Sequence, residues 1–310
     1  MQYAVPLSSR LALRLAWGLA LASVGCAKAS ADEPKGKSAD GGTTEVTGAS
    51  VDRRGPGSAS SSSPEPIIAF RAPGPPAADP AASHASSGAC PASMVLVEGD
   101  YCPDVEQRCL EWMDPPGTPY AHFRCKRYAQ PAICHGKRVH KRFCIDENER
   151  TEPGSDLPRN HVSWTAATSL CEAEGARLCK TSEWQFACEG EEMRPYPYGW
   201  ERDATACNVD VMTGLGRVGR LVDHRTPASA HPHCVSPFGV HDMAGNVDEW
   251  ATVEGLPRGK REIMKGSWWL PGRHACRNGQ GGHGAWYGGT ESGARCCAEA
   301  KPASEASASK

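Results

Sequence analysis

Two segments near the middle of the chain repeat apolar residues at helical spacing. In HVSWTAATSLCEAEGARL, residues 161–178, the apolar positions that recur are Trp164, Ala167, Leu170 and Cys171. Ser163 precedes them as an N-cap, and Gly175 follows as a stop. In KTSEWQFACEG, residues 180–190, a helix is predicted to begin at Thr181 or Ser182 and to end at Gly190, with one apolar side made of Trp184, Ala187 and Cys188.

Strand patterns are short. MVLVEGDYC, residues 94–102, and RFCIDEN, residues 142–148, are typical of strands, whereas Gly, Pro and Asn interrupt the sequence after Pro195. A domain with two short helices, a few strands and long loops has little regular structure to stabilise it. Disulfides or bound ions are the usual compensation.

The ends of the chain have the composition of disordered segments. Residues 27–89 consist mainly of Ser, Ala, Pro, Gly and scattered charges, so they bury too little apolar surface to offset chain entropy. This composition predicts a disordered linker in residues 27–89, and a similar composition predicts a disordered tail in residues 299–310. Residues 90–298 remain as one folded domain.

The first 26 residues resemble an export signal. Arg10 and Arg14 precede an apolar run, residues 15–25, that is too short to span a bilayer. The run ends in SVGC, which resembles a bacterial lipoprotein box and implies that Cys26 carries a lipid that anchors the chain in the cell envelope. The alternative is cleavage after Ala29, which would discard Cys26 and leave a periplasmic or secreted protein.

Cysteine and charge counts narrow the class of protein. Of 15 cysteines, 14 remain after Cys26 is set aside, and all of them lie in residues 90–298. An even number in an exported chain predicts seven disulfides. The formal net charge is −2 and the basic residues form no stripe, so we expect no nucleic-acid partner.

A series of motifs resembles one family. The order MVLVEGDYC, FCIDENERT, HVSW, ARL followed by SEW, YPYG, FGVHDMAGNVDEW, KGSWW and GARCC is similar to the formylglycine-generating enzyme, or sulfatase-modifying factor, family across nearly all of residues 92–298. The resemblance implies an irregular, loop-rich α+β domain related to the C-type lectin fold.

The acidic stretch DMAGNVDEW gains a candidate role from this resemblance. It implies a calcium site made by the Asp242 side chain, the carbonyls of Gly245 and Val247, and the Glu249 side chain. Such a hard cation prefers six to eight oxygen ligands, and a Gly lets the chain curl around it. A solvated acidic turn is the alternative. Asn208 and Val209 match a second calcium site of the family without an acidic partner nearby.

The enzymes of this family oxidise a sulfatase cysteine to formylglycine with copper held by two cysteines after a GS pair, because soft thiolates bind Cu(I). In KGSWWLPGRHACRNGQ, residues 265–280, Leu270 and Ala275 stand at the positions of those ligands. Copper is therefore not expected. Cys276 is either a displaced ligand or, by its alignment with a structural cysteine before Arg277, half of a disulfide.

The family pairing implies the disulfides Cys188–Cys276 and Cys171–Cys296. A Cys179–Cys207 pair is our additional hypothesis, because both residues lie near the loop after the second helix.

Other site types have weaker patterns. His231, His233 and Cys234 lack the second matching pair of a zinc site, and so do His274 and Cys276. The Gly-rich residues 279–289 lack the flanking strand and helix of a phosphate loop. A surface groove for a carbohydrate or peptide, or a buried aromatic core, would explain Trp268, Trp269, Trp286 and Tyr287.

Two functions fit these patterns. The first is a tethered, calcium-stabilised, non-catalytic binding or scaffolding module for a protein, peptide or glycan, attached to the membrane only through its lipid. The second is a family oxidase with a rearranged site at Cys276, with Ser267 and Trp268 beside it.

Overall fold

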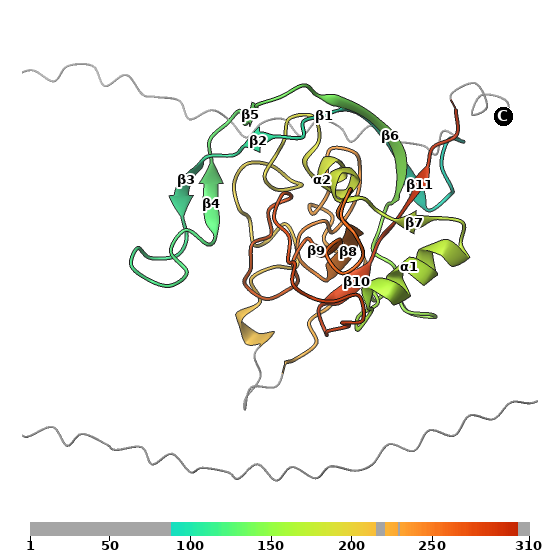
Figure 1. Cartoon of the computed structure of the whole chain (residues 1–310). Coiled ribbons are helices and arrows are strands. Elements are labelled where there is room, and N and C mark those ends of the chain that lie inside the picture. The colour runs from blue at the N-terminus through green and yellow to red at the C-terminus, as the bar shows by residue number, and fades with distance from the viewer. Residues whose placement is uncertain (1–87, 215–220, 229, 303–310) are drawn as a thin grey trace, which may run out of the picture. The chain divides into compact units, whose positions relative to one another are not determined.

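The computed structural model describes residues 88–214, 221–228 and 230–302 (Figure 1). The predicted signal, its Cys26, nearly all of the predicted linker and most of the tail lie outside these residues. Ala89 is buried, and its carbonyl accepts a hydrogen bond from the Lys301 amide at 2.9 Å. The two ends of the described chain therefore meet.

The main sheet has four strands in the order β1-β6-β11-β7. The strands are β1 (Met94–Tyr101), β6 (Val139–Asp146), β11 (Cys296–Glu299) and β7 (Arg177–Leu178), and every neighbouring pair is antiparallel. Both strands predicted from the sequence belong to this sheet. β6 begins three residues earlier than its pattern, because it pairs with β1 along the full length of both strands.

A second sheet has the order β10-β8-β9 and brings together three short segments of the irregular C-terminal region. They are β8 (Asp248–Thr252), β9 (Glu262–Lys265) and β10 (Ser292–Ala294). β8 runs parallel to β10 and antiparallel to β9. Two small two-stranded ladders, β2 (Val105–Glu106) with β5 (Ile133–Cys134) and β3 (Cys109–Trp112) with β4 (Cys125–Tyr128), extend to one side, and a 3₁₀ turn, η1, spans Met212–Gly214.

Both predicted helices are confirmed. α1 (Trp164–Ala173) begins after Ser163, whose hydroxyl accepts a hydrogen bond from the Ala166 amide at 3.1 Å, and Gly175 follows with φ = 70°. α2 (Thr181–Glu189) ends at Gly190 with φ = 67°. A β-carbon on Gly190 would also lie 2.8 Å from the Pro237 ring, so this stop needs glycine for space as well as for conformation.

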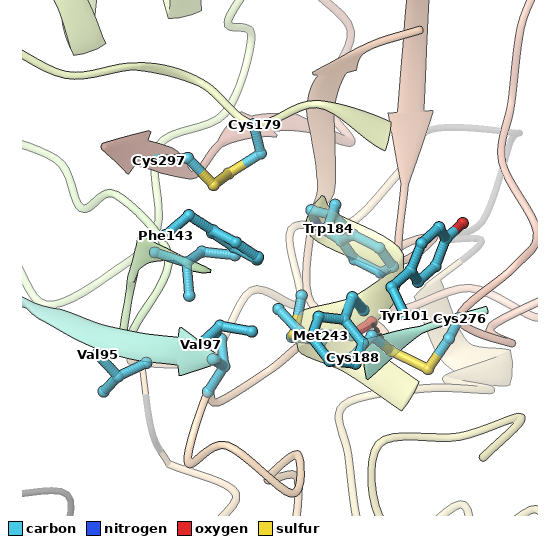
Figure 2. Close-up of a cluster of buried hydrophobic side chains, with 14 residues drawn as sticks. Val95, Val97, Tyr101, Phe143, Cys179, Trp184, Cys188, Met243, Cys276 and Cys297 are labelled. Carbon is cyan, nitrogen blue, oxygen red and sulfur yellow. Dashed lines mark hydrogen bonds between the residues drawn. A yellow bond between two sulfur atoms is a disulfide. The ribbon is translucent and has the colours of Figure 1, made fainter. Parts of the chain in front are cut away.

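The largest core cluster lies between β1, β6 and α2 (Figure 2). Val97, Phe143 and Trp184 meet there with Met243, which belongs to the acidic turn formed by residues 242–249. All four side chains are almost fully buried. Two disulfides, Cys179–Cys297 and Cys188–Cys276, close the same cluster. The core therefore fixes the acidic turn to α2, a helix that is distant from it in sequence.

Seven disulfides are present, as the cysteine count predicts. They are Cys90–Cys144, Cys102–Cys134, Cys109–Cys125, Cys171–Cys296, Cys179–Cys297, Cys188–Cys276 and Cys207–Cys234. The two pairs implied by the family resemblance are among them. The Cys179–Cys207 hypothesis is wrong, because the pairing of β7 with β11 brings Cys297 to Cys179 and leaves Cys207 for Cys234.

This disulfide content is typical of a domain that folds in an oxidising, extracytoplasmic compartment. No helix within the described ranges is long and apolar enough to cross a membrane.

Candidate functional site

The acidic turn, residues 242–249, curls tightly before it enters β8. Asp242, Gly245 and Asn246 all have positive φ angles, of 56°, 85° and 57°. A β-carbon on Gly245 would lie 2.2 Å from the carbonyl oxygen of Asn208, so only glycine allows this close approach. The Asn208 carbonyl accepts from the Asn246 amide at 3.0 Å, and the Asn208 side chain donates to Asn246 Oδ1 at 2.9 Å. Asn208 thus supports the turn directly.

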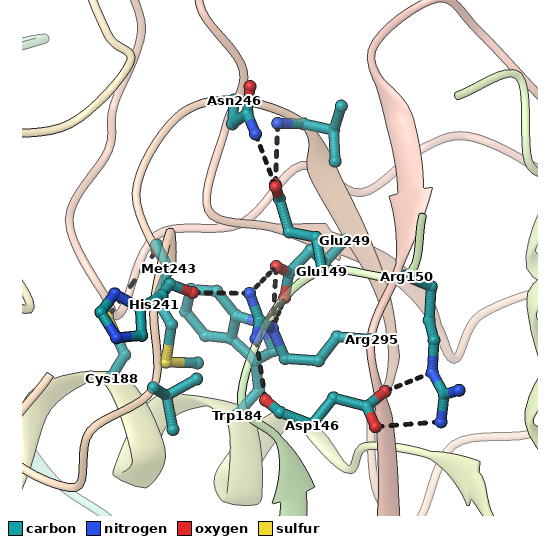
Figure 3. Close-up of polar contacts among 12 residues, drawn as sticks. Asp146, Glu149, Arg150, Trp184, Cys188, His241, Met243, Asn246, Glu249 and Arg295 are labelled. Carbon is teal, nitrogen blue, oxygen red and sulfur yellow. Dashed lines mark hydrogen bonds and ion pairs between the residues drawn. The ribbon is translucent and has the colours of Figure 1, made fainter. Parts of the chain in front are cut away.

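Glu249 points into the protein and meets Arg295 (Figure 3). Both side chains are fully buried, with Arg295 Nη2 2.7 Å and Nε 2.9 Å from Glu249 Oε1. Trp184 Nε1 donates to the other carboxylate oxygen at 2.5 Å. The guanidinium also donates to the carbonyls of Asp146 and His241, at 2.8 Å each. Arg295, which lies between β10 and β11, therefore joins the end of β6 to the acidic turn.

A third carboxylate, Glu149, lies on the other side of the turn. It accepts hydrogen bonds from Asn246 Nδ2 at 2.6 Å and from the Val247 amide at 3.2 Å. Burial, with the charges of Asp242 and Glu249 nearby, holds the pKa of Glu149 well above its ordinary range. Glu149 and Glu249 thus both interact with one buried guanidinium, that of Arg295.

The oxygen atoms of this turn are of the type that a hard cation prefers. They include the Asp242 and Glu249 carboxylates and the carbonyls of Gly245 and Val247. Within the described residues, no group of three or more His, Cys, Asp or Glu side chains could hold a metal ion. A calcium ion would therefore depend on the Gly245 and Val247 carbonyls as well as on Asp242 and Glu249, and it would share Glu249 with Arg295.

On the other face of β8, a cavity of about 350 Å³ opens beside the segment that follows β9. Its lining includes Phe123, Asp248, Ser267, Trp268, Arg273 and Gln280. The two residues of the predicted alternative oxidase site, Ser267 and Trp268, are therefore in the wall of this cavity. Trp269 is buried in the core, and Trp286 and Tyr287 lie on an exposed loop.

Asp248 forms a buried part of this cavity, with 1% of its surface exposed. Its Oδ1 accepts a hydrogen bond from the Ser267 amide at 3.0 Å, and Ser267 has a positive φ of 64°. Its Oδ2 is buried and has no hydrogen-bond partner among the described residues. Burial, together with the charges of Glu291 and Glu249, raises the pKa of Asp248 to about 8.

The segment 268–274 is held by a buried histidine. His274 Nε2 lies 2.8 Å from the Trp268 carbonyl, and Nδ1 lies 2.7 Å from Arg202 Nη2. Because a guanidinium can only donate, His274 is neutral, with its proton on Nε2. Burial and the Arg202 charge lower the pKa of His274 to about 4. Both ring nitrogens make hydrogen bonds, so neither is available to bind a metal.

The positions of the family's copper ligands contain no thiol. Leu270 packs in a cluster with Val247 and Trp269, and Ala275 is buried. Cys276 is bonded to Cys188 with an S–S distance of 2.05 Å. The residues present therefore do not fit the family's copper ion. Cys234, considered with His231 and His233 for zinc, is likewise in a disulfide.

Comparisons with known proteins show which sequences this chain resembles. A model of the sulfatase-modifying factor enzyme 1-like domain matches residues 119–300, more than half of the chain. The chain is 28% identical over 151 residues to the inactive C-alpha-formylglycine-generating enzyme 2 of Mus musculus, which covers 45% of this chain and 47% of that protein. It is 33% identical over 102 residues to the hercynine oxygenase of Mycobacterium tuberculosis, over 32% of this chain and 22% of that protein. The matches thus span less than half of either relative.

Solved structures with a similar course include CarF, at 17% identity with a TM-score of 0.46 over 67% of this chain and 98% of that one. PvdO from Pseudomonas aeruginosa matches at 16% identity with a TM-score of 0.42, over 66% of this chain and 94% of that one.

Proposed function

The chain belongs to the sulfatase-modifying factor enzyme 1-like domain family, and on that premise we propose that it is an exported member that binds a ligand without oxidising cysteine. The observation that carries this proposal is the disulfide between Cys276 and Cys188. A sulfur in a disulfide has no thiolate to offer to Cu(I), and all fourteen cysteines in the described residues are bonded in this way.

The name of one similar protein, from mouse, supports the same role. The mouse protein that resembles this chain is named as an inactive formylglycine-generating enzyme, so the family includes members without the activity. Loss of thiols at positions 270 and 275 gives a chemical reason for the same outcome in this chain.

Cu(I) titration of the purified, oxidised protein tests the proposal. We expect no stoichiometric binding, and a non-reducing peptide map should recover the Cys188–Cys276 crosslink. One equivalent of tightly bound Cu(I), lost in Cys276→Ala but retained in Cys109→Ala, would establish the oxidase alternative with Ser267 and Trp268 beside the metal. Cys109 is the matched control because its disulfide to Cys125 belongs to the β3–β4 ladder.

We also propose that calcium stabilises the acidic turn, through Asp242, Glu249 and the carbonyls of Gly245 and Val247. The carboxylate and carbonyl oxygens of this tight turn support this, since calcium prefers oxygen ligands of both kinds. An ion present at about 100 times its Kd adds roughly 2.7 kcal/mol to the free energy of unfolding.

Chelation of calcium should then lower the Tm by several degrees. Asp242→Asn should remove the difference between samples with and without chelator, whereas the exposed control Asp156→Asn should keep it. Identical melting curves for the wild-type protein with and without chelator would disprove the site.

Anchoring through Cys26 is the third part of the proposal, supported by the resemblance of SVGC to a lipoprotein box. Labelled palmitate fed to expressing cells should be incorporated into the wild-type protein and not into Cys26→Ser. Labelling that is equal in both proteins, or absent from both, would leave cleavage after Ala29 as the processing route.

A further inference from the structure

The cavity beside β8 contains a buried acidic residue, Asp248. The family's copper chemistry has no counterpart in this chain, so it does not explain this residue. Asp248 is 1% exposed, lines the cavity, and keeps Oδ2 without a hydrogen-bond partner among the described residues. A buried carboxylate oxygen without a partner is costly, and it is retained where a ligand completes it. The Asp248 amide donates to the Glu291 carbonyl at 2.7 Å, and Oδ1 accepts from the Ser267 amide at 3.0 Å, so both the backbone and the carboxylate are held in place.

The charges around Asp248 favour a positive group. Glu249 follows it in the chain, and Glu291 is nearly buried next to it across the β8–β10 pair. The nearest buried cation, Lys265, donates to the Asn278 carbonyl and lies over the Trp184 ring, 5.2 Å from its centroid. Lys265 is therefore already engaged with other groups, and the nearby charge of Glu291 favours a positive group beside Asp248.

The shape of the site restricts that positive group. Because so little of Asp248 is exposed, only a compact donor can reach its oxygen, and a primary ammonium is smaller than a guanidinium or a quaternary amine. The volume of about 350 Å³ lies near the lower end of small-molecule pockets, so the whole ligand has the size of an amino acid.

A second charge of opposite sign marks the exposed part of the same cavity. Arg273 lines it and lies over the Phe123 ring, 4.9 Å from its centroid. No ion pair joins Arg273 to any other described residue, although many of the arginines in these ranges have one. A guanidinium stacked on an aromatic ring and left without a carboxylate is suited to bind the carboxylate of a ligand.

We propose that this cavity binds a small zwitterion, an amino acid or ω-amino acid, with its primary ammonium against Asp248 Oδ2 and its carboxylate at Arg273. This inference rests on the proposed binding role and names its ligand class. Ser267 and Gly272 also line this cavity and are closely packed: a β-carbon on Gly272 would lie 2.5 Å from Ser267 Oγ.

The test is calorimetric titration of the oxidised full-length protein with ω-amino acids, from glycine to 6-aminohexanoate, at about pH 9, where Asp248 with its pKa of about 8 is ionised. Hexylamine and hexanoate each delete one charge of the longest member. At least one zwitterion should bind at least about tenfold more tightly than its single-charge analogue, because a charge-assisted hydrogen bond contributes about that factor. Asp248→Asn should weaken zwitterion binding by about tenfold or more, and Arg273→Gln should do the same. The exposed controls Asp156→Asn and Arg258→Gln should bind like the wild-type protein.

Absence of binding across the whole series would overturn the inference, and so would binding that Asp248→Asn leaves unchanged. Binding of hexylamine as tight as that of 6-aminohexanoate would also overturn it, since the carboxylate would then have no partner. These outcomes are independent of the copper titration: a protein that binds neither copper nor zwitterions keeps the proposed non-catalytic role and loses only this ligand class. If Asp248→Asn fails to fold, the two single-charge analogues still test the same contacts on the wild-type protein.

Discussion

Acid should loosen the cavity wall through one buried histidine. His274 is 1% exposed and neutral, and it joins the Trp268 carbonyl to the Arg202 guanidinium. Protonation would place a second donor on Nδ1, directly against a donor of Arg202. We therefore predict that part of the stability of the domain depends on keeping this ring uncharged, and that glutamine can replace it.

The size of the effect follows from the pKa shift. Burial and the Arg202 charge lower the pKa of His274 from an ordinary value of 6.5 to about 4. Because the folded state binds the proton less tightly than the unfolded state, its stability is fully present above pH 6.5 and is lost as the pH falls through 4. At about 1.4 kcal/mol per pKa unit, the contribution of His274 falls by roughly 3 kcal/mol between pH 7 and pH 4.

Unfolding of the oxidised protein with guanidinium chloride, followed by tryptophan fluorescence at pH 7 and at pH 4, measures this contribution. His274→Gln keeps one donor for Trp268 and one acceptor for Arg202 but cannot be protonated. The wild-type protein should lose roughly 3 kcal/mol more than the variant between the two pH values. Equal losses in both proteins would refute the reasoning, because all other titrating groups are shared.

Two further substitutions test the acidic turn. Arg295→Met leaves Glu249 as an uncompensated buried charge and should lower the free energy of unfolding by about 3–5 kcal/mol, with Arg295→Lys intermediate, as denaturant titration would show. Gly245→Ala should cost about 3 kcal/mol or more, because its β-carbon would lie 2.2 Å from a backbone oxygen. Gly255→Ala has a similar φ of 75° with no neighbour within 4 Å, so its Tm should fall much less.

Features that depend on neighbouring residues were predictable from the sequence. Both helices begin and end where local signals place them, because Ser163, Gly175 and Gly190 act on backbone groups within a few residues. The family motifs then supplied the fold class. The strands β8 to β11 were not predicted individually, since each has five residues or fewer and forms only by pairing with segments far away in the chain.

The vicinal cysteines show a signal that the sequence did contain. Cys296 and Cys297 are consecutive residues of β11, so their side chains leave opposite faces of the sheet. Cys296 joins the cluster at α1 through Cys171, and Cys297 joins the main core through Cys179. Reading CC as part of a strand would have predicted two partners on two faces, whereas the Cys179–Cys207 hypothesis relied on closeness to one loop.

The same alternation separates the two acids at the start of β8. Asp248 and Glu249 are adjacent in sequence and form one acidic motif, yet in a strand their side chains point to opposite sides. Glu249 reaches Arg295 and Trp184 in the core, and Asp248 lines the cavity. The negative charge of this motif therefore serves two purposes: one carboxylate ties the turn to the sheet, and the other is left available for a ligand. A substitution at Glu249 should affect mainly stability, and one at Asp248 should affect mainly binding.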